Sequence, residues 1–512
     1  MVGRLGGIEG SGARASVTTS TDTKTDYEVV IGLEVHCQLR TRSKMFSDCP
    51  REYFDQEPNT VIDPVSLGLP GTLPVINEQA VSFTILAGLA LGCTIPEHAK
   101  FDRKNYPYPD LPKGYQITQF DMPLCIDGGL EVETSEGTRF VRLERIHLEE
   151  DTGRLLHRDD GADVYSLIDF NRAGVPLMEL VSKPDIRSAE EAGAFLRSLR
   201  RIFRYTGVSD ADMEKGSFRC DANVSLRVRG VEELGAKVEV KNMNSFRSVQ
   251  RAIEFEIERQ TVLLDAGERI GQETRGWVDA TNETVSQRSK EKANDYRYFP
   301  EPDLPPLVIA REMVEELRAQ LPELPVARAA RFVSEYGVTS NESQLLVDSK
   351  QGAEDFEAAV TLAGGPALGR SVAHWFIGDV AGRINDVGRA DAELADTGIT
   401  PEHVAQLAKL VESKTITAST AKDVLVFAFE SGALPEAIVE ERGLKQVTDS
   451  GAIDEVVRGV IEANPKAVED YRGGKESAIK FFVGQVMREM KGRTDPNSAA
   501  ETIKAALDSS GD

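Results

Sequence analysis

The chain has 512 residues, which is too long for a single hydrophobic core and predicts two to four domains. It contains no apolar run of about 18 residues, so the sequence predicts no transmembrane helix. The formal net charge of −24 argues against bulk attraction to nucleic acid or to an anionic membrane, although local basic patches remain compatible with it. Five cysteines without regular spacing argue against a disulfide framework and favour a reducing, cytoplasmic location.

The first 25 residues are rich in Gly, Ser and Thr, and they have no apolar core. We therefore expect a disordered leader and not a secretory signal. The next segment, YEVVIGLEVHCQLR at residues 27–40, alternates apolar and polar positions as a half-buried strand does. Glu34 and His36 share its polar face, about 6.5 to 7 Å apart along the strand. This pattern fits either a solvated sheet face or a pair of metal ligands.

Later segments repeat the pattern of one apolar and one chemically active face. HLEEDTGR at residues 147–154 supplies Glu149, Glu150 and Asp151 at the end of an alternating run. SFRCDANVSLRV at residues 217–228 places Arg219, Asp221 and Asn223 on the same face. KVEVKNMNSFR at residues 237–247 puts Lys237, Glu239 and Lys241 on one face and ends in amide and hydroxyl side chains. Each could be a solvated face; together on one sheet, they would form a site for a cation and phosphate.

Two helices are expected among these strands, at residues 188–206 and 248–266, each with an apolar stripe and a glycine at its end. Four prolines in residues 298–307 indicate a stiff connection, and the chain after it has helical periodicity. The sequence therefore predicts an α+β fold. We expect a sheet domain at residues 26–305, an all-α helical domain at 306–395 and an α-helical tail domain at 396–512. The expected C-terminal helices lie at residues 312–320, 325–336, 353–363, 402–412, 418–431, 453–463 and 477–491.

The residue types favour a hard cation with oxygen ligands, such as magnesium, over structural zinc. Magnesium commonly binds through a few carboxylates together with substrate phosphates, which points to nucleotide-dependent chemistry. GGPALGRS at residues 364–371 has the spacing of a P-loop, but Arg370 replaces the required lysine and no strand is expected before it. We find no nucleophile elbow and no Cys-His setting, so the chain is not expected to form an acyl-enzyme.

Several long segments together resemble the B subunits of the bacterial aspartyl/glutamyl-tRNA amidotransferases. They appear in the order IGLEVHCQL, FDRKNYPYPDLPKGYQITQFDMPL, HLEEDTGR, DFNRAGVPLMELVSKPDIRS, GSFRCDAN, EVKNMNSFRSVQRAIEFE, DYRYFPEPDLPPL and FFVGQVMREMKGRTDP. The resemblance spans residues 27–307 and resumes at 481–496. It implies a catalytic cradle domain with an antiparallel sheet related to glutamine synthetase, followed by the helical domain and a tail that binds tRNA.

The resemblance also implies a function. The family uses ATP and magnesium to phosphorylate the side-chain carboxylate of misacylated Asp-tRNA(Asn) or Glu-tRNA(Gln), and ammonia from glutamine then replaces the phosphate. The implied partners are an amidase subunit, which releases the ammonia, and a small third subunit, in a heterotrimer. We expect tRNA affinity to fall when the chain after about residue 400 is removed, because the basic helix 477–491 lies there. The alternatives are a non-catalytic protein that binds tRNA or assembles the complex and, less favoured, a metal-dependent phosphodiesterase.

Site residues are carried over by motif. The resemblance implies catalytic roles for Glu34, His36, Glu150, Glu179 and Asp221, and a metal group of Glu34, His36, Glu149, Glu150 and Asp221. The candidates for nucleotide or phosphate contacts are Lys104, Tyr106, Arg219, Lys241 and Asn242.

One departure from the family concerns zinc. Some members bind zinc through four cysteines, whose positions here hold Ser47, Cys49, Asp63 and Ser66. Because only one thiol remains, we expect no structural zinc.

Overall fold

The computed structural model describes residues 25–161, 163–289, 296–389, 392–446, 450–475, 477–490 and 493–509. The expected leader lies outside these residues except for Thr25. The chain divides into two compact units. The first comprises the residues up to 84 together with 91–198 and 212–309, and the second comprises 85–90, 199–211 and the chain from 310.

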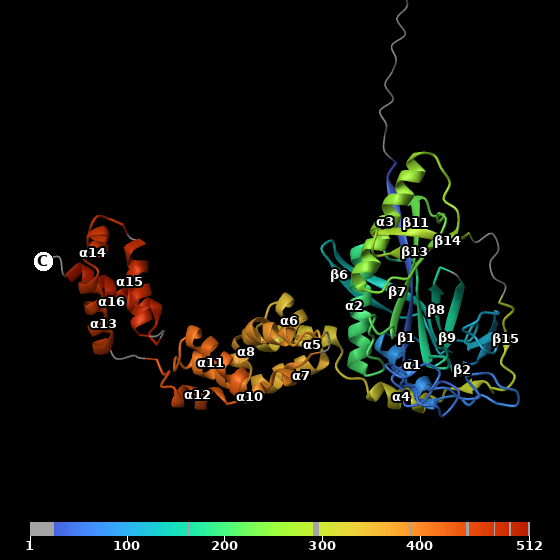
Figure 1. The fold of residues 1–512 in the computed structure, drawn as a ribbon, viewed down its shortest axis with the longest axis horizontal. Helices are drawn as coiled ribbons and strands as arrows, with labels where there is room; N and C mark the ends of the chain where they lie inside the picture. The colour runs from blue at the N-terminus through green and yellow to red at the C-terminus, as the bar shows by residue number, and fades with distance from the viewer. Residues whose placement is uncertain are drawn as a thin grey trace, which may run out of the picture. The chain divides into compact units, whose positions relative to one another are not determined.

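The first unit is built on a mixed, mainly antiparallel sheet (Figure 1). Its strands in chain order are β1 (Tyr27–Gln38), β2 (His98–Ala99), β3 (Asp102–Asn105), β4 (Tyr115–Thr118), β5 (Cys125–Ile126), β6 (Gly129–Thr134), β7 (Gly137–Glu150), β8 (Arg154–Asp159), β9 (Val164–Asp169), β10 (Pro176–Ser182), β11 (Phe218–Val228), β12 (Val238–Lys241), β13 (Glu273–Val278), β14 (Glu283–Ser289), β15 (Phe299–Pro300) and β16 (Leu307–Val308). Among the described residues the main sheet has the order β14-β13-β12-β11-β1-β10-β7-β4-β3-β15, with β5 and β6 also paired to β7. Only the β12–β13 pair is parallel within this path.

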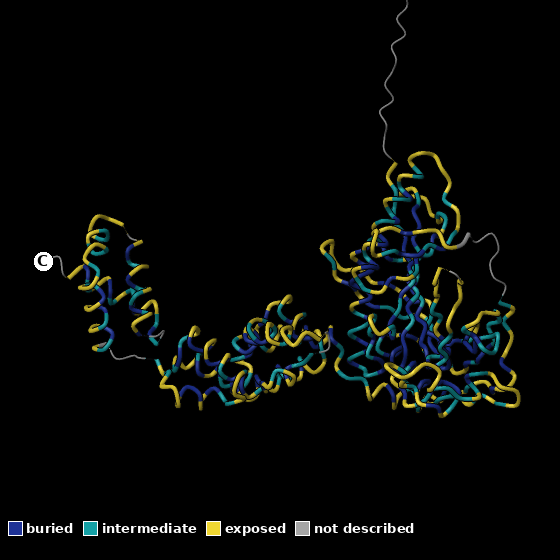
Figure 2. Tube along the Cα trace, viewed as in Figure 1, coloured by how far each residue is buried: buried dark blue, intermediate teal, exposed yellow. Residues whose placement is uncertain are grey.

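Strand β1 lies at the centre of the sheet, between β10 and β11. Its apolar positions are buried, as the alternation predicts: Ile31, Leu33 and Val35 are almost inaccessible to solvent. Helix α3 (Phe246–Asp265) packs against β11 and buries Val249 and Ile253. The side chain of Ser245 caps its first turn by accepting a hydrogen bond from the N–H of Ser248. Figure 2 shows the buried segments concentrated along the central strands. One face of the sheet therefore forms the core.

Helix α2 (Ala189–Thr206) confirms the first expected helix. The hydroxyl of Ser188 accepts a hydrogen bond from the N–H of Glu191, at 3.1 Å. Helix α1 (Glu78–Ala90) was not expected, because its sequence EQAVSFTILAGLA is apolar on most sides and has no amphipathic period.

The second unit is helical. Its elements are α4 (Arg311–Ala319), α5 (Pro325–Tyr336), α6 (Ser340–Leu346), α7 (Lys350–Ala363), η1 (Pro366–Leu368), α8 (Gly369–Trp375), η2 (Phe376–Val380), α9 (Ala381–Asp386), η3 (Leu394–Thr397), α10 (Pro401–Glu412), α11 (Ala418–Ser431), α12 (Pro435–Glu441), α13 (Ser450–Ala463), α14 (Pro465–Arg472), α15 (Ser477–Glu489) and α16 (Pro496–Ser509). All seven expected C-terminal helices are present, and the α+β fold class is confirmed. The shorter helices α6, α12 and α14 were missed because seven or eight residues give too few turns for a clear period.

The buried side chains of the second unit form two separate cores. The first contains Phe332, Phe356 and Trp375 but also Leu407 and Val424. It therefore includes residues on both sides of the expected boundary between 395 and 396, and that boundary stays a prediction. The second core runs from Ile453 to Leu507 and is contributed by α13, α15 and α16. All residues of the first core precede those of the second core in the sequence.

Three further expectations concern transmembrane helices, the cysteines and the segment that resembles a P-loop. In the described part of the chain, no helix combines the length and the apolarity needed to cross a membrane. All five cysteines are buried thiols. The segment that resembles a P-loop follows helix α7 and not a strand, which agrees with its rejection as a nucleotide motif.

Candidate active site

The site is built on one row of side chains that crosses four neighbouring strands. In the antiparallel register His36 on β1 lies opposite Arg219 on β11 and opposite Glu179 on β10. Glu179 in turn lies opposite His147 on β7. Because side chains that pair directly across a sheet point to the same face, this register gathers residues separated by up to 183 positions in the sequence. The row carries two imidazoles, a carboxylate and a guanidinium.

Two imidazoles and two carboxylates form a closed group, which we call the His-Glu cluster: His36, His147, Glu149 and Glu179. His36 Nε2 lies 3.3 Å from Glu179 Oε2 and 3.9 Å from Glu149 Oε1. His147 Nε2 lies 3.4 Å from Glu179 Oε2 and 3.7 Å from Glu149 Oε2. Glu34, His36 and Glu179 bring three possible ligand atoms within 4.8 Å of one another, as do His147, Glu149 and Glu179.

Burial and opposite charges set the ionisation of the His-Glu cluster. Burial disfavours the imidazolium of His147, but Glu179 and Glu149 outweigh this effect and raise its pKa to about 9. Burial likewise opposes ionisation of Glu179, yet His147 and His36 hold the pKa of this carboxyl well below its usual range. Burial and the charge of Glu179 raise the pKa of Glu34. The cluster therefore holds at least one carboxylate firmly in its charged, cation-binding form.

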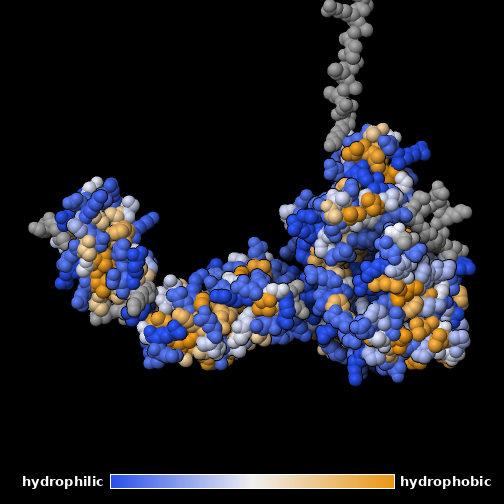
Figure 3. All heavy atoms as spheres, viewed as in Figure 1, coloured by the Kyte–Doolittle hydropathy of each residue, from blue (hydrophilic) through white to orange (hydrophobic). Residues whose placement is uncertain are grey.

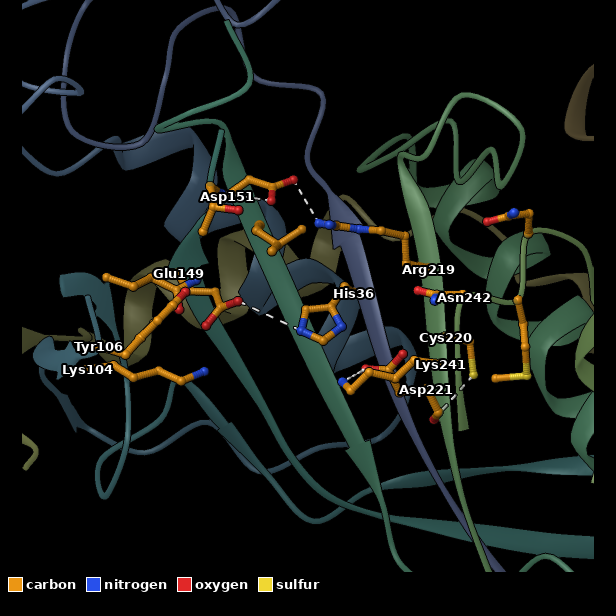
Figure 4. Close-up of a pocket in the computed structure, with 15 residues that line it drawn as sticks. His36, Lys104, Tyr106, Glu149, Asp151, Arg219, Cys220, Asp221, Lys241 and Asn242 are labelled. Atoms are coloured by element: carbon orange, nitrogen blue, oxygen red, sulfur yellow. Dashed lines mark hydrogen bonds and ion pairs between the residues drawn. The ribbon is translucent and has the colours of Figure 1, made fainter. Parts of the chain in front are cut away.

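A cavity of about 350 Å³ opens beside the His-Glu cluster (Figure 4). Its lining is mostly polar and comes from strands far apart in the sequence: His36, Lys104, Tyr106, Gln116, Glu149, Asp151, Thr152, Leu177, Arg219, Cys220, Asp221, Lys241, Asn242, Met243 and Asn244. The structure thus brings together Lys104, Tyr106, Arg219, Lys241 and Asn242, the five residues expected to contact nucleotide or phosphate. A polar cavity of this size can accommodate a triphosphate or a comparable anionic group.

Cations of the cavity are held in place by carboxylates and by aromatic rings. Lys104 Nζ lies 5.2 Å from the ring centroid of Tyr296, and the carboxylates of Glu149 and Glu179 outweigh burial and raise its pKa. Lys241 forms an ion pair with Asp221 and lies 3.3 Å from Glu239 Oε1. Against the effect of burial, these two acids raise the pKa of Lys241. Both lysines are therefore charged at neutral pH and face the cavity.

Asn242 follows Lys241 directly and has a φ of 65°. This left-handed conformation is uncommon for residues other than glycine, and asparagine is among the residues that tolerate it best. It ends β12 and turns the chain along the cavity wall, where Asn242, Met243 and Asn244 all contribute to the lining.

Glu150 is one of the expected metal ligands that lie outside the His-Glu cluster. Its Oε1 lies 2.7 Å from Lys113 Nζ and accepts a hydrogen bond from the N–H of Ile117 at 3.0 Å. Successive residues of a strand point to opposite faces, so Glu149 and Glu150 cannot both face the cavity. Asp221 does line the cavity, but its carboxylate is paired with Lys241 and is not part of either three-residue ligand group.

The sequence interpretation missed His147 and did not assign a role to Asp151. The signal for His147 was present, because it stands two residues before Glu149 in the alternating run, as Glu34 stands two residues before His36. Applied to β7, the same rule places His147 with Glu149 and separates both from Glu150. The structure therefore adds a second histidine to the group around His36.

The four positions that the resemblance implies for zinc cysteines, Ser47, Cys49, Asp63 and Ser66, lie in the chain between β1 and α1. Asp63 Oδ2 accepts a hydrogen bond from the Ser66 hydroxyl at 2.6 Å, and Asp63 Oδ1 accepts the N–H groups of Val65 and Ser66. Burial raises the pKa of the Cys49 thiol. The Asp63 carboxylate is thus engaged within its own turn, and the absence of structural zinc stays a prediction.

Comparison with known proteins shows to which class of protein the chain belongs. The model described as GatB/GatE catalytic domain matches residues 29–315, and the model described as GatB domain matches residues 354–507. Among similar proteins are the B subunits of aspartyl/glutamyl-tRNA(Asn/Gln) amidotransferases from three bacteria. That of Thermomicrobium roseum is 50% identical over 482 residues, which cover 94% of this chain and 99% of the relative. That of Carboxydothermus hydrogenoformans is 50% identical over 483 residues, with the same coverage. That of a Synechococcus strain is 45% identical over 96% of this chain and 100% of the relative.

The class is that of tRNA amidotransferase subunits with a GatB/GatE-type catalytic domain. Within it, the chain belongs to the family of aspartyl/glutamyl-tRNA amidotransferase B subunits, which confirms the resemblance found in the sequence.

Proposed function

We propose that this chain activates, with ATP, the side-chain carboxylate of Asp or Glu attached to tRNA(Asn) or tRNA(Gln), and that ammonia derived from glutamine then converts it to the amide. The family of the chain and the names of its relatives support the transamidation. The observation that carries the activation step is the His-Glu cluster bordered by charged Lys104, Lys241 and Arg219 in one polar cavity.

The chemistry needs two displacements. The γ-phosphoryl group of ATP passes to a carboxylate oxygen of the substrate, giving an acyl phosphate and ADP. Ammonia then attacks the acyl carbon, the C–N bond forms and phosphate leaves. Negative charge accumulates on the transferring phosphoryl group, so fixed cations around the cavity lower the barrier by neutralising it. Lys104, Lys241 and Arg219 line the cavity and can supply that positive charge.

The donor set fits magnesium. Oxygen donors suit this ion, and Glu149 and Glu179 provide them beside the His36 imidazole. We propose that His36, Glu149 and Glu179 hold it, with Glu34 close to His36 and Glu179 and with His147 in contact with both carboxylates. When bound, magnesium neutralises phosphate charge and orients the phosphate chain. Glu150 is not included in this proposed ligand set, because its carboxylate is bound to Lys113.

We also propose an assembly with an amidase and a small third protein, as a heterotrimer working in the cytoplasm. The relatives are named as B subunits, which supports the presence of other subunits. Residues 64–77 support it as well, since this loop has no charged residue and exposes Leu69, Leu73 and Val75. Figure 3 shows hydrophobic residues on the surface of the first unit. Exposed apolar side chains grouped in this way are typical of surfaces that meet another protein.

The test is amidation by the purified complex. The full chain is co-expressed with the amidase and the small third protein, and ATP- and glutamine-dependent amide formation is measured on Glu-tRNA(Gln) and Asp-tRNA(Asn). Glu179→Gln is expected to lower the rate of amidation by at least about 100-fold, because the Glu179 carboxylate contacts both His36 and His147. Binding of tRNA should persist.

Two outcomes would contradict the proposal. Full amidation by Glu179→Gln would favour a non-catalytic role in tRNA binding or assembly. Cleavage of the tRNA instead of amidation would favour a phosphodiesterase.

A further inference from the structure

Asp151 is a buried acid of the cavity whose role the family resemblance leaves open. It follows β7 directly, and its side chain is almost inaccessible to solvent. Its Oδ2 accepts a hydrogen bond from Arg219 Nη2 at 2.7 Å and another from Gln38 Nε2 at 2.8 Å. Its Oδ1 accepts the N–H of Thr152 at 2.9 Å and lies 3.6 Å from Arg172 Nε. Both carboxylate oxygens are therefore engaged, and the side chain is fixed on four sides.

The Asp151 carboxylate binds the Arg219 guanidinium through one nitrogen. Only Nη2 contacts Asp151, while Nε is buried and has no hydrogen-bond acceptor among the described residues. About one third of the side chain, 35%, is accessible, and Arg219 lines the cavity (Figure 4). A guanidinium has five N–H donors in a rigid fork. The contact with Asp151 occupies one donor and Nε is buried, so the remaining terminal N–H donors are the ones that can reach an anion in the cavity.

The neighbours of Arg219 would otherwise compete for it. Arg219 stands directly opposite His36, and Glu149 already attracts its positive charge. A guanidinium released from Asp151 could pair with Glu149 or Glu179 and occupy the place of a cation there. Carboxylate pairs with Arg are among the stronger hydrogen-bonded contacts in proteins, so Glu149 and Glu179 are competing acceptors for a released guanidinium.

We propose that Asp151 is a positioning residue of the phosphate site: it keeps the Arg219 guanidinium away from Glu149 and Glu179 and directs it to the phosphates of the nucleotide. Gln38 supports it by donating to the same carboxylate oxygen, and Tyr53 supports Gln38, since the Gln38 amide donates to its hydroxyl at 3.1 Å. This inference rests on the proposed function. Its ligand is the polyphosphate of ATP, and it acts only through Arg219.

The test is a double-mutant cycle in the complete complex. Asp151→Asn is expected to raise KM for ATP by about tenfold or more, the size of a lost charge-assisted hydrogen bond, with a smaller change in kcat. Arg219→Ala should raise it similarly. If Asp151 acts through Arg219, adding Asp151→Asn to Arg219→Ala should change KM by less than about twofold. Equilibrium binding of ATP without turnover provides a second readout.

Asp185→Asn is the control for loss of a carboxylate charge that pairs with an arginine, because Asp185 accepts hydrogen bonds from Arg142 at 2.6 and 2.8 Å but does not line the cavity. Three results would each overturn the inference. The KM for ATP of Asp151→Asn could equal that of the control, or the effects of the two substitutions on KM for ATP could multiply in the double variant. The third is a rise that is confined to the KM for the aminoacyl-tRNA. Should Asp151→Asn fail to fold, Gln38→Leu is measured instead, and an unchanged KM for ATP in that variant would overturn it. A wild-type complex without ATP-dependent amidation would refute the proposed function itself.

Discussion

Two adjacent acids on β7 offer a sharp test of the proposed metal group. Glu149 accepts a hydrogen bond from the Thr118 hydroxyl at 2.9 Å and lies within 3.9 Å of both imidazoles. Glu150 points to the other face and pairs with Lys113. The same chemical change, Glu to Gln, at these neighbouring positions therefore removes a charge from the cavity in one variant and from the opposite face in the other.

Glu149→Gln is expected to weaken binding of Mn²⁺, used as a probe for Mg²⁺, by at least about 100-fold, since even residues that only support metal ligands cost about 10- to 100-fold. That loss corresponds to about 3 kcal/mol. Glu150→Gln should bind Mn²⁺ as the wild type does, although the unpaired Lys113 should lower the stability of the fold. The assay is titration of metal-free protein followed by electron paramagnetic resonance. Equal losses in both variants, or none in Glu149→Gln, would refute the assignment of the ligands.

Two further predictions concern pH and the tail. The pKa of His147 is raised from its ordinary 6.5 to about 9, so its contribution to stability is complete below about pH 6.5 and is lost as pH rises through 9. In metal-free protein the melting temperature should fall more steeply between pH 7 and 10 for the wild type than for His147→Gln, and equal slopes would contradict this. A chain ending at Gln446 should bind tRNA more weakly in a fluorescence anisotropy assay yet keep its first helical core, whereas an end at residue 400 would also remove Leu407 and Val424 from that core. Unchanged tRNA affinity in the chain that ends at Gln446 would place the nucleic-acid surface elsewhere. Added salt should weaken tRNA binding wherever the protein contacts phosphate.

Periodicity predicted most of the fold because it reports burial directly. The alternation of residues 27–40 corresponds to β1, and the apolar stripe of 325–336 corresponds to α5 residue for residue. Helix α1 was missed for the same reason, since its sequence is apolar on most sides and has no amphipathic period. The pattern predicts an element only when one side of that element meets water.

The motifs of the sequence supplied the residue types of the site and, through the family resemblance, the candidates Lys104, Arg219 and Lys241. They did not supply the arrangement of the site. Glu150 was grouped with Glu149 by its position in a motif, although strand geometry sends the two carboxylates to opposite faces. His147 was passed over, although the same geometry places it with Glu149.

What the sequence alone determined is which face of each strand is polar, since that follows from alternation within one segment. Which polar faces become neighbours was decided only by the tertiary structure. The pairing of β1 with both β10 and β11 brings His36 between Glu179 and Arg219. Strand pairing between distant segments depends on the packing of the whole core, and no local pattern encodes it. The His-Glu cluster and the contact between Asp151 and Arg219 exist for that reason.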